Sequence, residues 1–158
     1  MADFSIRSGA NPPPDWTELH ALLVAAFKVM EGKIDPPSSL AAMTADSLRV
    51  KAGEEFLVLA ERDERLVGCG FGTASDKAFY LSKIAVAPSM QGQHILRRML
   101  PLFENEARRL GCDALILQSR VEMTETHPAF EALGFRKVSG SSHPGFDRTT
   151  SWHFRKAV

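Results

Sequence analysis

In seven short stretches of the chain, apolar residues either alternate with polar residues or follow one another without interruption, and both patterns predict strands. Residues 78–86 are apolar on both faces, which is typical of a strand in the middle of a sheet. The turn-forming letters RDER separate two further strands and predict an antiparallel hairpin. The remaining strands are shorter. The expected strands cover residues 4–8, 56–60, 66–71, 78–86, 113–119, 135–140 and 150–156.

Other stretches carry apolar residues at spacings of three and four, which predicts helices. Asp15 can cap a helix with an apolar face from Trp16 to Phe27. Ser38 or Ser39 can cap a second helix, over residues 40–50, that ends near Gly53. A third helix is expected over residues 92–110, and a short fourth helix over residues 127–133 is stopped by a glycine.

The predicted elements follow the order strand, two helices, three strands, helix, strand, helix and two strands. We therefore expect one α/β (α+β) domain over residues 1–158, with a mixed sheet of six or seven strands and about four helices. The unit from residue 78 to residue 119 should form a right-handed parallel crossover.

Composition narrows the class of protein. Lys plus Arg and Asp plus Glu each number 19, so the chain lacks the excess of positive charge expected of a nucleic-acid binder. No apolar run reaches about 18 residues, and a membrane span is not expected. Cys69 and Cys112 have no metal-ligand spacing, which predicts reduced thiols and no metal site. The first ten residues lack the pattern of a signal peptide, so a cytoplasmic location is expected.

The stretch VAPSMQGQHILRRML, residues 86–100, is a candidate anion site. It reads as a strand that ends at a proline, turns at Gly92 and enters a helix. The first amides of a helix have no partner within the helix, and together with the helix dipole they favour an anion. These features alone are compatible with a phosphate loop and with an ordinary strand-to-helix connection.

This stretch resembles the acetyl-CoA-binding motif of the GCN5-related N-acetyltransferase (GNAT) family, V-x-P-x-x-R/Q-G-x-G-I-G/A-x-x-L-L. The positions in register are Val86, Pro88, Gln91, Gly92, Ile95 and Leu100. The segment HPAFEALGFRKV, residues 127–138, resembles the later motif A-x-x-x-Y-x-x-x-G-F of the same family. The resemblance implies the GNAT fold and acetyl-CoA as co-substrate. It also implies that the strand before the loop separates from its neighbour.

The resemblance assigns the cofactor contacts by position. Ile84, Ala85 and Val86 would hold the pantetheine arm through their backbone groups. The pyrophosphate would be held by the amides of Gln91, Gly92, Gln93, His94, Ile95 and Leu96. Arg97 would either neutralise a phosphate or serve as a solvated helix charge.

Two side chains depart from the family motif. His94 stands where the family has glycine, and it could either donate a hydrogen bond to a phosphate or narrow the pocket. Leu96 stands where the family has glycine or alanine, and its spacing with Leu100 also fits a core stripe. Pro101 lies inside the predicted helix and should kink it, at a cost of about 3 kcal/mol.

The expected catalytic groups are missing from their usual positions. The resemblance implies a Glu base near Ser82 and a Tyr acid at Phe130, and neither residue has that chemistry. Glu122 and His127 are candidate catalytic substitutes, because both follow the strand that ends near residue 119. Their structural alternatives are a solvated loop carboxylate and a residue that begins a helix before Pro128.

Four residues in the expected acceptor loops are candidate substrate contacts. His143 and Asp147 would shape the acceptor pocket, and Glu31 and Asp35 would meet a cationic substrate. The leading hypothesis is an N-acetyltransferase acting on a primary amine of a small molecule or a peptide amino terminus. The alternatives are a non-catalytic acyl-CoA-binding or regulatory module and an interaction domain without CoA. A homodimer is a further possibility, since dimers are common among similar proteins.

Overall fold

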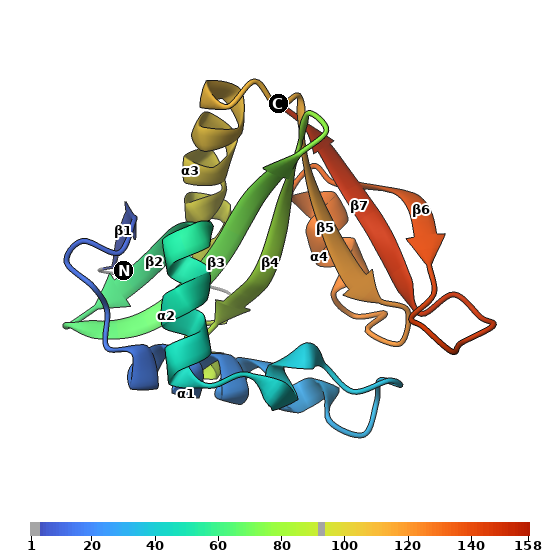
Figure 1. Cartoon of the computed structure of the whole chain (residues 1–158), viewed down its shortest axis with the longest axis horizontal. Coiled ribbons are helices and arrows are strands. Elements are labelled where there is room, and N and C mark those ends of the chain that lie inside the picture. Colours follow the sequence, from blue (N-terminus) through green and yellow to red (C-terminus); the bar gives the residue numbers. More distant parts are fainter. Residues whose placement is uncertain (1–3, 92–93) are drawn as a thin grey trace.

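A seven-stranded mixed sheet forms the centre of the molecule in the computed structural model, which describes residues 4–91 and 94–158 (Figure 1). The strand order is β1-β2-β3-β4-β5-β7-β6. Among the described strands, β4 and β5 pair in parallel and the other neighbouring pairs are antiparallel. The strands are β1 (Ser5–Ser8), β2 (Phe56–Arg62), β3 (Arg65–Ser75), β4 (Ala78–Val86), β5 (Ala114–Arg120), β6 (Arg136–Ser141) and β7 (Ser151–Ala157).

Four α-helices lie in the described part of the chain, together with short 3₁₀ turns. The α-helices are α1 (Trp16–Phe27), α2 (Ala45–Glu54), α3 (Ile95–Arg109) and α4 (His127–Ala132). The 3₁₀ turns are η1 (Lys28–Met30), η2 (Ser39–Ala42) and η3 (Pro88–Met90). The fold class, the number of strands and the number of helices expected from the sequence are thus confirmed.

The second helix was predicted to begin at residue 40, and this start is wrong, because α2 begins at Ala45. Ser38 caps only η2, because the chain becomes extended at Met43 and Thr44. Thr44 then begins α2 with a capping box: its Oγ1 accepts from the Ser47 N–H at 3.1 Å, and the Ser47 hydroxyl accepts from the Thr44 N–H at 2.8 Å. At the first helix, the expected cap is confirmed, since Asp15 accepts from two amides of the first turn.

The core consists of two clusters on opposite faces of the sheet. Leu57 and Leu59 pack with α1 and α2, whereas their neighbour Val58 packs with α3. Successive side chains of a strand point to opposite faces, so α1 and α2 cover one face and α3 covers the other. The largest buried side chain of α3, Phe103, has no exposed surface.

Helix α3 begins at Ile95 and continues through Pro101 to Arg109, so the proline does not end it. The kink expected at Pro101 stays a prediction. Gly92 and Gln93, where the sequence pattern placed the helix start, lie outside the described residues. No helix in the described ranges is long and apolar enough to cross a membrane.

Candidate active site

Strands β4 and β5 separate along their length. They pair over only three residues on each strand, Ala78–Tyr80 with Ala114–Ile116. Beyond this point β4 continues to Val86 and β5 continues to Arg120 without pairing with each other, while β7 pairs with the other edge of β5 along its whole length (Figure 1). The edge of β4 from residue 81 to residue 86 therefore faces a gap, as the sequence resemblance implied.

A β-bulge reshapes β4 beside this gap. Phe71 pairs with Ser82 and Cys69 pairs with Ala85, so one residue of β3 stands opposite two residues of β4. The bulged residue Lys83 has φ +49°. The residue opposite it, Gly70, has no room for a side chain, because a Cβ there would lie 2.8 Å from Phe103 Cζ. A bulge of this kind bends a strand and redirects its side chains.

The backbone of Val86 faces the open edge. The next residue, Ala87, donates its N–H to Val67 O on β3 at 2.8 Å. Antiparallel ladders alternate, so Ala85 also directs its backbone groups to β3 and Val86 directs its groups away from it. The Val86 carbonyl accepts from Gln91 Nε2 at 3.1 Å, which ties the loop to the end of the strand.

The first turn of α3 presents amides without helix partners. Its first backbone hydrogen bond runs from the Arg98 N–H to His94 O at 3.2 Å, so the N–H groups of residues 95–97 precede the helical ladder. His94 is left-handed, with φ 60° and ψ 28°, and its exposed side chain makes no capping hydrogen bond. This is a conformation that glycine adopts at least cost, which gives a physical reason for glycine at this position of the motif.

The side chains of this turn have separate roles. Ile95 is buried, and Leu96 is half-buried against the core cluster on the α3 face, so the expected core role of Leu96 is confirmed. Arg97 is exposed. Within the described ranges it makes no side-chain hydrogen bond or ion pair, which leaves its charge available to an anion.

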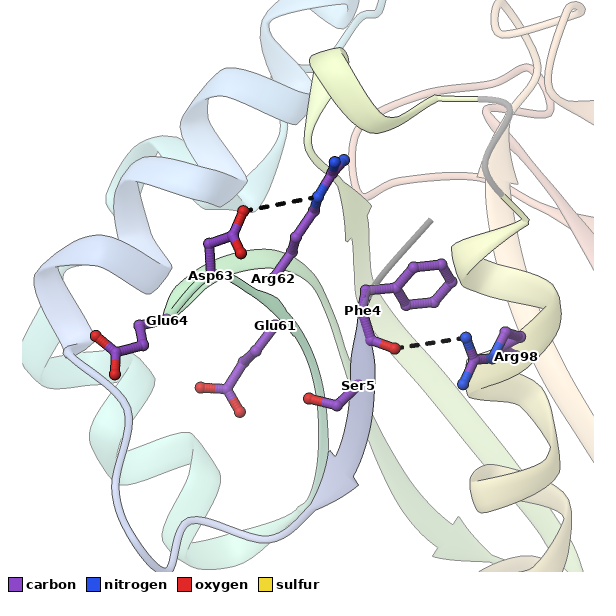
Figure 2. A pocket seen from close by; sticks show the side chains of 7 residues that line it. All are labelled: Phe4, Ser5, Glu61, Arg62, Asp63, Glu64 and Arg98. Carbon is purple, nitrogen blue, oxygen red and sulfur yellow. Dashed lines mark hydrogen bonds and ion pairs between the residues drawn. The ribbon is translucent and has the colours of Figure 1, made fainter. Parts of the chain in front are cut away.

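A cavity of about 620 Å³ lies at the other edge of the molecule, between β1, the β2–β3 turn and α3 (Figure 2). Three of its charged side chains form ion pairs: Glu61 pairs with Arg7, outside the lining, at 2.7 Å, and Arg62 lies 3.9 Å from Asp63. Arg98 stacks on the Phe4 ring, with its guanidinium carbon 4.4 Å from the ring centroid. Because β1 is the sheet edge remote from β5, this cavity is separate from the gap.

Charged side chains gather where β5 ends. Arg148 Nη2 lies 3.5 Å from Glu122 Oε2 and 3.9 Å from Asp35 Oδ2, and it donates to Asp35 O at 2.9 Å. Arg120 donates to Pro36 O at 2.5 Å and to Pro37 O at 3.1 Å. These contacts fasten the loop after α1 to the end of β5 and to the last hairpin.

Glu122 has one carboxylate oxygen committed and one uncommitted. Oε2 faces Arg148, whereas Oε1 is buried and has no hydrogen-bond partner. A buried acceptor without a partner costs free energy, typically about 1–3 kcal/mol, so such atoms call for an explanation. Oε1 is chemically suited to accept a proton or an N–H from a bound molecule.

Two histidines lie near this cluster. His143 Nδ1 is hydrogen-bonded to Thr150 Oγ1. Burial lowers the pKa of His143, the positive charges of Arg120 and Arg148 lower it further, and Glu122 opposes them. His127 Nε2 lies 3.0 Å from Arg120 O, and it must donate there because a carbonyl only accepts.

The remaining candidates are placed apart from the gap or lack the required chemistry. Phe130 packs its ring against Phe135 and Phe154, with centroids 6.4 Å and 5.7 Å away. Glu31 lines a separate cavity of about 430 Å³ between α1 and η2. Asp147 is exposed and, across residues 4–91 and 94–158, makes no hydrogen bond or ion pair through its side chain.

The sequence reasoning missed Lys83. Its side chain leaves the bulge on the face covered by α1 and α2, and Nζ donates to Ser39 Oγ at 2.7 Å. Burial lowers the pKa of Lys83, the charges of Lys51 and Arg120 lower it further, and Glu55 opposes them. The one available signal was a lysine within the otherwise apolar run YLSKIAV.

Residues 11–135 match the model of the acetyltransferase (GNAT) family, so the chain belongs to that family, whose co-substrate is acetyl-CoA. Over 82 residues it is 34% identical to an IAA acetyltransferase of Azospirillum brasilense, an alignment that covers 51% of this chain and 53% of that protein. The chain thus spans about half the length of this curated relative.

Two solved structures share the fold across the whole chain. The PaiA N-acetyltransferase of Thermoplasma acidophilum, in complex with coenzyme A, superposes with a TM-score of 0.82 at 12% identity, covering 99% of this chain and 100% of that one. An acetyltransferase of Streptococcus agalactiae gives a TM-score of 0.77 at 18% identity, with both chains fully covered.

Proposed function

We propose that this protein is an acetyl-CoA-dependent N-acetyltransferase that acts on a primary amine of a small molecule or on a peptide amino terminus. The observation that carries the proposal is the gap between β4 and β5, which opens beside the uncapped first turn of α3. A strand edge with free backbone groups suits the amides of a pantetheine arm. Unpartnered helix amides suit a diphosphate.

The cofactor would lie along the open edge of β4 and end at α3. Val86 offers its N–H to the pantetheine arm, since its carbonyl accepts from Gln91, and Ile84 lies two residues before it on the same edge, whereas Ala85 is committed to β3. The N–H groups of residues 95–97 and the positive end of the helix dipole favour the diphosphate. In this arrangement the exposed Arg97 adds positive charge at the first turn of α3.

Glu122 is the proposed general base. Bound acetyl-CoA would supply an acetyl thioester: the acceptor nitrogen forms the new N–C bond and releases one N–H proton to solvent, the C–S bond breaks, and a solvent proton reaches the departing sulfur. The amine must first lose its own proton, directly or through water, and the uncommitted Oε1 of Glu122 can accept it. Thiols have pKa values of about 8.5, so the thiolate can leave without the acid that Phe130 fails to provide.

A second candidate function is a non-catalytic acyl-CoA-binding module. Phe130 has no hydroxyl, and His127 is held by the Arg120 carbonyl as a residue that fixes the start of α4. A domain that binds acyl-CoA without turnover would share the open edge of β4 but would have no use for Glu122.

Replacement of Glu122 distinguishes these functions. The release of free CoA thiol is followed over a panel of primary amines, and acetyl-CoA binding is measured by calorimetry. We expect Glu122→Gln to lower kcat by about 10²–10⁴-fold while the Kd for acetyl-CoA is unchanged. The matched control is Glu125→Gln, because Glu125 is exposed on the same loop.

Three results have distinct meanings. Turnover that is lost in Glu122→Gln and kept in the control supports the transferase. Tight binding with no thiol release for any amine supports the module. Absence of heat with acetyl-CoA at millimolar concentration refutes both.

A further inference from the structure

We propose that the acceptor carries a carboxylate close to its amine, as a free amino acid does, and that Lys83 and Arg120 recognise this carboxylate from the two sides of the gap. The inference rests on the proposed acetyltransferase function and specifies its substrate class. It replaces the cationic acceptor expected from the sequence with a zwitterionic one.

Lys83 has an ammonium group that forms no ion pair within the described ranges, and the nearby Glu55 is already paired with Lys51. The side chain is half-buried and makes one hydrogen bond, to the Ser39 hydroxyl. Among the described residues, no carboxylate oxygen lies within 4.0 Å of its Nζ, whereas Lys51 beside it has Glu55 at 2.8 Å. Partial burial of a cation without a counter-ion is costly, and an anionic ligand would offset this cost.

Arg120 brings a second cation from the other strand. Two of its five N–H donors are used by the carbonyls of Pro36 and Pro37, which fixes the position of the guanidinium. In the described part of the chain no carboxylate oxygen lies within 4.0 Å of it. Lys83 donates to Ser39, two residues after Pro37, so the segment from Pro36 to Ser39 contacts both cations. The positive charge of Arg120 accordingly lowers the pKa of Lys83.

The phosphates of CoA cannot be the anion that these cations await. Lys83 points to Ser39, on the face of the sheet covered by α1 and α2. The proposed diphosphate site is the first turn of α3, which covers the opposite face. The pantetheine arm and the thioester are uncharged, which leaves the acceptor as the source of negative charge.

Glu122 supplies the complementary charge for the amine. It follows Arg120 by two residues, and its unpartnered Oε1 belongs to the same cluster at the end of β5. The acidic groups predicted to attract a cationic acceptor are otherwise occupied or elsewhere: Asp35 faces Arg148, and Glu31 lines the separate cavity between α1 and η2. Glu55 Oε1 is the other buried carboxylate oxygen without a partner, but that carboxylate already pairs with Lys51. Two cations without an ion pair and the free oxygen of Glu122 match a zwitterion better than a polyamine.

The test compares each amino acid with its own carboxamide as acceptor, in the wild-type protein and in three variants. Lys83→Met removes the charge at nearly constant length, and Lys83→Arg keeps it. Lys28→Met is the control, because Lys28 is exposed and its replacement changes the net charge by the same amount. Calorimetry with an N-acetylated amino acid in the presence of CoA gives a second measurement that does not depend on turnover.

We expect kcat/KM for amino acids to exceed that for the carboxamides. Lys83→Met should lower kcat/KM for amino acids by roughly 10- to 100-fold, mainly by raising KM, because the loss of a hydrogen bond to a charged group has an effect of this size. Lys83→Arg should keep most of the preference, and Lys28→Met all of it. The N-acetyl amino acid should bind the wild type and bind Lys83→Met at least 10-fold more weakly, with acetyl-CoA affinity equal in both.

Equal turnover of carboxamides or polyamines, or an unchanged preference in Lys83→Met, overturns the inference and leaves the transferase function standing. Failure of the wild type to bind acetyl-CoA is a different result, because it removes the proposed function itself. A thermal melt of each variant identifies any loss of folding. If Lys83→Met does not fold, the preference of Lys83→Arg for amino acids over carboxamides is the result that tests the inference.

Discussion

The left-handed backbone of His94 allows a direct test of the loop that precedes α3. At φ 60° and ψ 28°, an L-residue costs about 1–2 kcal/mol, whereas glycine is nearly free of this cost. Glycine loses roughly 0.5–1 kcal/mol more than alanine through the entropy of the unfolded chain. His94→Gly should therefore be more stable than His94→Ala by roughly 0.5–1 kcal/mol, since both variants remove the same imidazole.

Equilibrium unfolding in urea measures this difference, which corresponds to a Tm difference of about 1–4 °C for a chain of this size. The control is the same pair of substitutions at Asn105, which is exposed in the middle of α3. There the order should reverse, with alanine more stable by about 1 kcal/mol. Alanine more stable than glycine at both positions would refute the assigned backbone conformation of His94.

Two further predictions concern the core beside the gap. Gly70→Ala should destabilise the protein by about 1–3 kcal/mol, because its Cβ would lie 2.8 Å from Phe103 Cζ. The control Gly53→Ala, whose Cβ would have no atom within 4 Å, should be neutral or stabilising by up to about 1 kcal/mol. Equal urea midpoints of these two variants would contradict this prediction. Burial raises the pKa of Cys69 to about 12, so the free energy of unfolding should fall as pH rises from about 9 towards 12. Cys69→Ala should show a shallower fall in the same titration, and an identical slope would argue against the buried thiol.

The elements that depend on local pattern could be predicted from the sequence. The central strand was expected over residues 78–86, and β4 has those bounds. The Asp15 cap follows from a side chain and the amides two and three residues later, so only neighbouring residues are involved. The second helix was misplaced, because Ser38 and Thr44 are both good caps and the choice between them depends on packing.

The features that form the site depend on contacts between distant residues. The bulge at Lys83 lies opposite Gly70, where Phe103 of α3 leaves no room for a side chain, and the sequence of β4 alone does not predict it. The contact between Arg148 and Asp35 joins positions 113 residues apart, in the last hairpin and in the loop after α1. Glu122 was a candidate by its place after β5, but its unpartnered oxygen appears only in three dimensions.

The central claim is that acetyl-CoA binds along the open edge of β4 and at the first turn of α3. Titration of the ¹⁵N-labelled protein with acetyl-CoA, followed by amide NMR, tests it most directly. We predict the largest amide shifts at Val86 and at residues 95–97, with slower hydrogen exchange at the same sites. Shifts confined to the cavity between β1 and α3, or none at millimolar acetyl-CoA, would contradict the claim.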